Sequence, residues 1–200
     1  ATVPGNVELD LLAAGVLEDP SVGNRVYDLL PYETFEWWYR RRFDSPDLEP
    51  GQTAHLVFEG LDCLGTIWLN DRPVGESDNM LIAHRFDVTG LLRPHGDNDL
   101  VVRIRSAVLE GRSHAPDPCE YAFPINYESL AMRKAPHMYG WDIMPRIVSA
   151  GLWRDVNLEI VGPTRWQSVY WTTESVDAAK GTARLFAAWS FVTDRRDLRG

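Results

Sequence analysis

The 200-residue sequence has little cysteine, a deficit of basic charge and no long hydrophobic run. Cys63 and Cys119 are far apart, so at most one disulfide could form, and a disulfide-stabilised scaffold is excluded. A formal net charge of −9 disfavours nucleic acid and anionic membranes as partners. No apolar run approaches the ~18 residues that a membrane span requires. The first residues carry no signal-peptide pattern, and the composition indicates no compartment.

Tryptophan is the residue type that the chain has in excess. Hydrophobic residues make up 44% and charged residues 24% of the chain, values typical of a globular protein, but there are eight tryptophans. A large flat ring is either packed in a core or placed against a flat apolar ligand face. We therefore looked for tryptophans beside polar groups that could complete a binding site.

Short segments of alternating polarity, separated by turns, predict an antiparallel β-sandwich. The clearest is Asp99–Arg105, in which Leu100, Val102 and Ile104 share one face. Asn6 is a suitable N-cap for a short helix over residues 6–16. Strands are expected at 37–43, 55–59, 66–70, 83–88, 99–105, 152–160, 169–172 and 183–191. The absence of a βαβ rhythm makes the expected fold class all-β.

Two features interrupt this pattern. Residues 106–150 contain five of the thirteen prolines and almost no period-two alternation, which predicts a long, functional irregular segment. Gly162-Pro163 then separates a first domain, 1–162, from residues 163–200. Because two or three strands cannot bury a core alone, we expect 163–200 to be the opening of a second β-sandwich.

The irregular segment contains the best candidate site. In Gly140-Trp141-Asp142 a flat indole stands beside a carboxylate, and this pair suits a sugar: the ring covers C–H groups while the carboxylate accepts hydrogen bonds from hydroxyls. We predict that Trp141 and Asp142 bind substrate. The alternative is a loop anchor, with Trp141 packed under the sandwich and Asp142 capping a turn. The residues expected at the pocket rim are Arg133, His137, Tyr139 and Arg146.

Basic residues gather around this motif. Arg133, Lys134, His137 and Arg146 could form a cationic site for a uronate or sulfated sugar. We favour the second interpretation, in which they pair with the excess acidic residues. Trp153 and Arg154 open a periodic strand, so packing and a local salt bridge are expected there.

The quoted residues resemble a known family. Tyr139-Gly-Trp-Asp-Ile-Met-Pro-Arg146, with Gly151-Leu-Trp-Arg154, is similar to the Phe/Tyr-Gly-Trp-Asp-Trp-Gly-Pro-Arg and Gly-Ile-Trp-Arg motifs of the β-mannosidase-like branch of glycoside hydrolase family two. The resemblance is to the N-terminal sugar-binding domain of that family. Further matches follow in the expected order: Val3-Pro-Gly-Asn-Val7, Asp10 to Pro20, Gly23-Asn24, Trp38-Tyr-Arg40, Phe58-Glu-Gly-Leu-Asp62 and Ile67-Trp-Leu-Asn70.

The resemblance implies a fold and a role. Residues 1–162 would form a jelly-roll (galactose-binding-like) sandwich, followed by the start of an immunoglobulin-like sandwich. The chain would be a non-catalytic domain of a retaining exo-glycosidase that contacts the catalytic barrel and lends the loop 132–146 to the terminal-sugar pocket. Ile143 and Met144 replace the second Trp and the Gly of the motif, so a glucoside, galactoside or glucuronide stands beside a mannoside as the ligand.

The catalytic chemistry itself is not expected in this chain. Retaining hydrolysis needs two carboxyls about 5 Å apart, and the family's acid/base lies in an Asn-Glu dipeptide, which is absent; Asn126-Tyr-Glu128 has the wrong spacing. No Gly-x-Ser-x-Gly elbow occurs, and His114, Cys119 and His137 match no zinc pattern, so neither metal nor cofactor is predicted. Two other roles stay open: a free-standing carbohydrate-binding module and a purely structural domain.

Overall fold

The computed structural model describes residues 1–93, 95–115, 117 and 126–193. The chain is mostly β, with several antiparallel sheets. It divides into two compact units: the first comprises 1–47 and 55–159, and the second comprises 48–54 and the chain from residue 160 onward. Each unit is described separately below.

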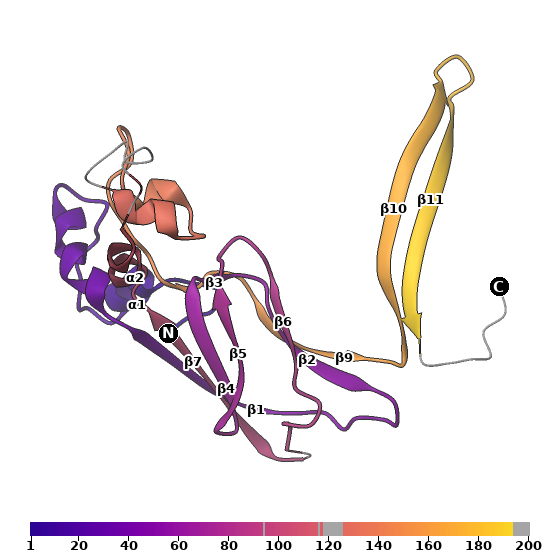
Figure 1. The fold of residues 1–200 in the computed structure, drawn as a ribbon, viewed down its shortest axis with the longest axis horizontal. Helices are drawn as coiled ribbons and strands as arrows, with labels where there is room; N and C mark the ends of the chain where they lie inside the picture. The colour runs from indigo at the N-terminus through magenta and orange to yellow at the C-terminus, as the bar shows by residue number, and fades with distance from the viewer. Residues whose placement is uncertain (94, 116, 118–125, 194–200) are drawn as a thin grey trace. The chain divides into compact units, whose positions relative to one another are not determined.

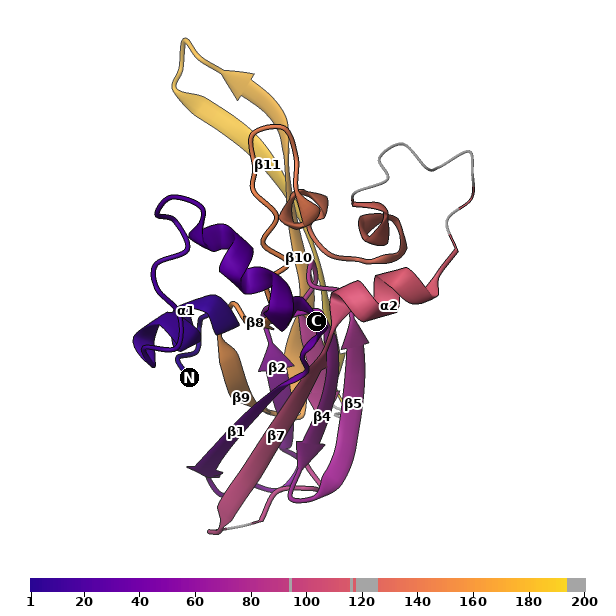
Figure 2. The same cartoon turned by 90° about the vertical axis from the view of Figure 1, so that its left-hand side faces the viewer.

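The first unit contains a four-stranded antiparallel sheet, shown in Figure 2. Its strands are β1 (Trp37–Asp44), β7 (Asp97–Arg105), β4 (Leu64–Leu69) and β5 (Arg72–Asp78), in the order β1-β7-β4-β5. Tyr39 pairs with Val102, which pairs in turn with Ile67. Val102 and Ile67 are fully buried. The alternation predicted for Asp99–Arg105 therefore does point the apolar side of β7 into the core.

A second sheet has the order β6-β2-β9. It consists of β6 (His84–Asp87), β2 (Thr53–Phe58) and β9 (Val156–Val161), and Leu56 and Phe58 of β2 are buried. A short antiparallel pair, β3 (Leu61–Asp62) with β8 (Gly151–Leu152), joins residues that are 89 and 91 positions apart. This pair fixes the point at which the irregular segment returns to the sheets.

Short helices lie at one end of these sheets, as Figures 1 and 2 both show. Helix α1 (Val7–Ala13) is capped by Asn6, as predicted: the Leu9 N–H donates to its side-chain oxygen at 3.1 Å. Helix α2 (Ala107–Ser113) is capped in the same way by Ser106. Within the described residues, no helix is long and apolar enough to cross a membrane.

The irregular segment has more structure than the sequence indicated. Its described part contains α2 and two 3₁₀ helices, η2 (Tyr127–Ala131) and η3 (Pro136–Tyr139), while 116 and 118–125 lie outside the described residues. Another 3₁₀ helix, η1 (Arg25–Thr34), lies in a stretch for which the sequence predicted no helix or strand. These elements were missed because 3₁₀ turns need only local i→i+3 hydrogen bonds and leave no long apolar period in the sequence.

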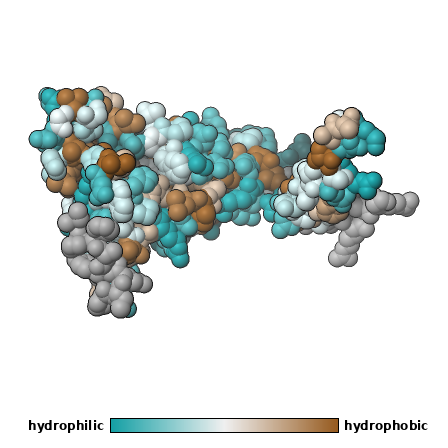
Figure 3. All heavy atoms as spheres, turned by 90° about the horizontal axis from the view of Figure 1, so that it is seen from above, coloured by the Kyte–Doolittle hydropathy of each residue, from teal (hydrophilic) through white to brown (hydrophobic). Residues whose placement is uncertain are grey.

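The second unit contains a hairpin of β10 (Thr164–Asp177) and β11 (Thr182–Thr193), which confirms both strands predicted after Pro163. Trp166, Trp171 and Trp189 are each at least 60% exposed on this hairpin. Figure 3 shows hydrophobic residues on its surface. A two-stranded ribbon has no second layer against which to bury these rings.

Replacing Ile67 with Ala tests the core of the first unit. The side chain is 0% exposed, so Ile67→Ala should lower the free energy of unfolding by roughly 2–5 kcal/mol. Ile82→Ala is the matched control, because Ile82 is 54% exposed and should cost far less. Urea unfolding of both variants measures the difference, and equal losses would contradict the core assignment.

Candidate functional site

The Trp141–Asp142 motif forms the tip of a tight turn. The Trp141 and Met144 backbones exchange two hydrogen bonds, at 3.0 and 3.1 Å, so Asp142 and Ile143 occupy the two central positions. Gly140 precedes the turn with a φ of 103°, a conformation that side chains rarely adopt. Asp142 and Ile143 are exposed, Ile143 to 87%.

The exposure of these side chains bears on the two interpretations of the motif. Trp141 is 56% exposed and is therefore not packed under the sandwich. The Asp142 carboxylate makes no hydrogen bond or ion pair with any residue in the described part of the chain, and so it caps no turn there. An indole and a carboxylate on adjacent residues are thus both exposed to solvent, and both groups are of types that can contact a sugar.

Arg146, expected at the pocket rim, is held by two buried carboxylates. Its guanidinium donates to both oxygens of Glu33, at 2.7 and 2.9 Å, and to Glu128 at 3.2 Å. The side chains of Glu33 and Glu128 are only 7% and 3% exposed. Burial works to raise the pKa of Glu128, but a backbone hydrogen bond and the charge of Arg146 together hold that pKa below its ordinary value.

Tyr139 lies beneath this arginine. It is 1% exposed and belongs to a core cluster with Cys63 and Val108, so its ring is in the interior and not at a rim. The Arg146 guanidinium lies 5.6 Å from the centre of the Tyr139 ring, within the range of a cation–π interaction. The buried Tyr139 ring therefore helps to hold the Arg146 guanidinium in place.

The other basic residues of the motif separate into different environments. Arg133 pairs with Asp78 at the surface, at 2.5 Å, while His137 is exposed. Lys134 is fully buried and pairs with Asp62, so it is not at a surface. The expectation that these cations pair with acidic residues is confirmed for Arg133, Lys134 and Arg146.

Buried Lys134 belongs to a polar chain that reaches the N-terminal helix. Its ammonium also donates to the Ser149 carbonyl at 2.6 Å, and the Ser149 hydroxyl donates to the Glu8 carboxylate at 2.6 Å. Burial raises the pKa of Glu8, and burial also raises that of Asp62 against the opposing charge of Lys134. These contacts fix residues 134 and 149, on either side of the Trp141 turn, to β3 and α1.

The packing expected of Trp153 is observed, but the salt bridge expected of Arg154 is not among the ion pairs of the described residues. Trp153 packs against the core cluster that contains Tyr139. The Arg154 guanidinium lies 4.2 Å from the centre of the Trp153 ring, so its observed partner is an aromatic face.

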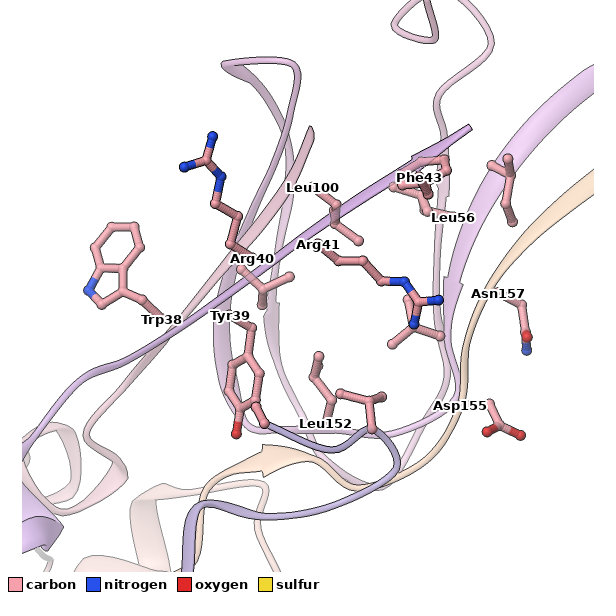
Figure 4. A pocket seen from close by; sticks show the side chains of 15 residues that line it. Trp38, Tyr39, Arg40, Arg41, Phe43, Leu56, Leu100, Leu152, Asp155 and Asn157 are labelled. Carbon is pink, nitrogen blue, oxygen red and sulfur yellow. The ribbon is translucent and has the colours of Figure 1, made fainter. Parts of the chain in front are cut away.

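A cavity lies elsewhere in the first unit and includes no residue of 132–146. Its volume is about 770 Å³, and it lies between the unpaired edges of β1 and β9. In Figure 4, Tyr39 and Arg41 point into this space, whereas Trp38 and Arg40 point away. Because Leu100 of β7 and Leu56 of β2 also line it, the space lies between the four-stranded sheet and the sheet that contains β2 and β9.

Metal and catalytic chemistry find little support in the described residues. They contain no group of three or more His, Cys, Asp or Glu side chains that could hold a metal ion. Glu128, the nearest match to a catalytic acid in the sequence, is buried in ion pairs with Arg112 and Arg146. That environment keeps it charged and structural.

Comparison with known proteins gives the family. Residues 1–154 match the family described as "Glycosyl hydrolase 2 galactose-binding domain-like". The chain belongs to this family. It is 39% identical over 163 residues to "Beta-mannosidase B" of Aspergillus terreus and 35% identical over 190 residues to that of Emericella nidulans. These matches cover 80% and 94% of the chain, but only 19% and 22% of the relatives.

Solved structures agree with this membership. The crystal structure of β-D-mannosidase from Dictyoglomus thermophilum matches 96% of the chain and 23% of its own length, at 30% identity and a TM-score of 0.82. The exo-chitosanase CsxA of Amycolatopsis orientalis matches 98% of the chain and 21% of its own length, at 18% identity and a TM-score of 0.68, which shows a shared fold. The chain thus spans about a fifth of the length of the relatives it matches.

Sequence reasoning missed the acidic half of the site. Glu33, Asp62 and Glu128 come from three different elements, and Glu33 is 113 residues from its partner Arg146. No local spacing connects such residues. The only signal in the sequence was the cluster of basic residues in the proline-rich segment, because such a cluster requires acidic partners elsewhere in the chain.

The raised pKa of Glu8 predicts a pH-dependent effect on stability. A carboxyl with a raised folded-state pKa favours folding below its unfolded pKa, and that contribution is lost as pH rises through the folded pKa. Glu8→Gln removes the cost of burying the charge. Its melting temperature should therefore match that of the unmodified chain near pH 4 and exceed it at pH 7.5. Exposed Glu76→Gln is the control, and a Glu8→Gln difference that does not grow with pH would contradict the assignment.

Proposed function

We propose that this chain is the N-terminal, non-catalytic domain of a β-mannosidase-like exo-glycosidase, and that its loop 132–146 contributes to the pocket for the terminal sugar. The observation that carries the proposal is the exposed Asp142 carboxylate beside exposed Trp141, on a turn fixed at both ends. Two relatives bear the name β-mannosidase and extend far beyond the matched region. That extra length favours an enzyme domain over a free-standing carbohydrate-binding module or a bracing domain.

The division of the protein follows from this proposal. Residues 1–162 would be the jelly-roll domain, and 163–200 the first strands of an immunoglobulin-like domain. The exposed tryptophans of the β10–β11 hairpin support the second part, because they require further strands to cover them. The catalytic barrel, with its pair of carboxylates for retaining hydrolysis, would lie in the remainder of the polypeptide and contact this domain.

Within the pocket, Asp142 would accept hydrogen bonds from hydroxyls of the non-reducing terminal sugar, and Trp141 would cover an adjacent C–H face. Exposed His137 is the basic residue of the motif best placed for the rim. Ile143 and Met144 present aliphatic surface in place of a second ring and a glycine. They would leave the terminal sugar less enclosed, so mannosides, glucosides, galactosides and glucuronides all belong in the first substrate screen.

Asp142→Asn in the full-length protein tests the site. The amide keeps the shape and removes the charge, so a charge-assisted hydrogen bond becomes a neutral one that is weaker by ~1–2 kcal/mol. The value of kcat/KM should fall about tenfold, while Tm should barely change. Asp28→Asn, another exposed carboxylate, should leave both unchanged. A mutant that melts earlier but turns over normally would make Asp142 a loop anchor.

The isolated 200-residue chain should show no glycosidase activity, because its sequence lacks the Asn-Glu dipeptide in which the resemblance places the family's acid/base. Purified chain is incubated with chromogenic β-mannoside and β-glucoside and compared with the full-length protein. Turnover that survives repurification would place catalytic groups inside this chain and overturn the proposed division of labour.

A further inference from the structure

The Trp141 turn is fastened at both ends by one cluster of side chains. On the outgoing side, the Asn126 side chain donates to the Gly140 carbonyl at 3.1 Å, and Arg146 donates to the Tyr139 carbonyl at 3.4 Å. After the turn, the chain is held by Arg146, which is itself a residue of the loop. The same guanidinium therefore contacts the backbone before the turn and anchors the backbone after it.

The anchors of this guanidinium come from distant elements. Glu33 ends η1 and Glu128 lies in η2, and each is nearly inaccessible to solvent. The planar guanidinium fork reaches both Glu33 oxygens and both Glu128 oxygens, a geometry that a lysine ammonium cannot reproduce. We call Glu33, Glu128 and Arg146 the carboxylate clasp.

We infer that Arg146 is the positioning residue of the candidate sugar site, and that the carboxylate clasp fixes the place from which Asp142 meets the substrate. This inference rests on the proposed function. The Arg146 guanidinium does not itself bind the ligand, because its N–H donors are occupied by the two carboxylates and the Tyr139 carbonyl. Arg146 acts on the sugar indirectly, by setting the position of the turn. The turn is short: only four residues separate Gly140 from Pro145, which precedes Arg146.

The geometry explains why positioning matters at this site. At the tip, the Asp142 side chain has no partner among the described residues, and Ile143 is 87% exposed. A hydrogen bond to a sugar hydroxyl weakens steeply when distance or angle departs from the optimum. A turn released from the clasp would sample positions in which the carboxylate misses the hydroxyl, even though the domain core stays folded.

The test is a double-mutant cycle in the full-length protein, assayed with chromogenic β-mannoside or with whichever β-glycoside proves to be turned over. Arg146→Lys keeps the charge but loses the fork, and Glu33→Gln keeps the shape but loses the charge. Each should lower kcat/KM about tenfold with a modest change in Tm. In an Asp142→Asn background the same changes should lower kcat/KM by less than twofold more, because the carboxylate through which they act is gone.

Arg112→Met is the matched control. Arg112 also pairs with Glu128, at 3.1 Å, but contacts no residue of the turn. It should lower Tm while kcat/KM per folded molecule stays normal, which separates positioning from general stability.

The outcomes distinguish this inference from the proposed function. If Asp142→Asn alone has normal kinetics, the proposed function fails. If Asp142→Asn is impaired while folded Arg146→Lys and Glu33→Gln turn over normally, only the inference about Arg146 is overturned. Losses that add fully to that of Asp142→Asn would also overturn it, because the clasp would then act independently of the carboxylate.

Discussion

The buried ion pair of Lys134 and Asp62 is the constraint on which the irregular segment depends. Both side chains are out of solvent, so the desolvation of two charges is offset only by their mutual attraction and by the Ser149 carbonyl. Removing one partner of such a pair typically costs about 3–5 kcal/mol, because the other charge is left buried alone. The pair thus enforces one path for the chain between β3 and the segment that precedes the Trp141 turn.

A second charged cluster, the carboxylate clasp, holds the same segment at Glu128 and Arg146. Between them, the two clusters replace the regular hydrogen bonding that a strand or helix would supply. This explains how a proline-rich stretch holds a defined turn at the protein surface. Ion pairs are directional when a guanidinium fork is involved, and so they set the orientation of a loop as well as its attachment.

The β content was readable from the sequence, for identifiable reasons, while the sugar site at Trp141 and Asp142 stays a prediction. The alternation in β7 and the Asn6 cap are local signals, and the structure follows both. The Trp141–Asp142 tip was recognisable because its residue types suit a sugar. The burial of Tyr139 and Lys134 was not, since tertiary packing places Tyr139 in the cluster with Cys63 and Val108 and brings Lys134 to Asp62. Lys134 shows the difficulty most clearly, because a lysine beside an arginine in a loop ordinarily indicates exposure.

The position of β1 at the edge of its sheet has a consequence for self-association. Edge strand β1 carries Arg40, Arg41 and Arg42 in succession, and β1 pairs with β7 alone among the described strands. Arg40 and Arg42 are paired with Asp99 and Asp97 of the neighbouring strand β7, while Arg41 points into the cavity. Charged side chains on an exposed edge strand are a common protection against edge-to-edge pairing. We therefore expect the arginines of β1 to disfavour the pairing of identical domains along this edge.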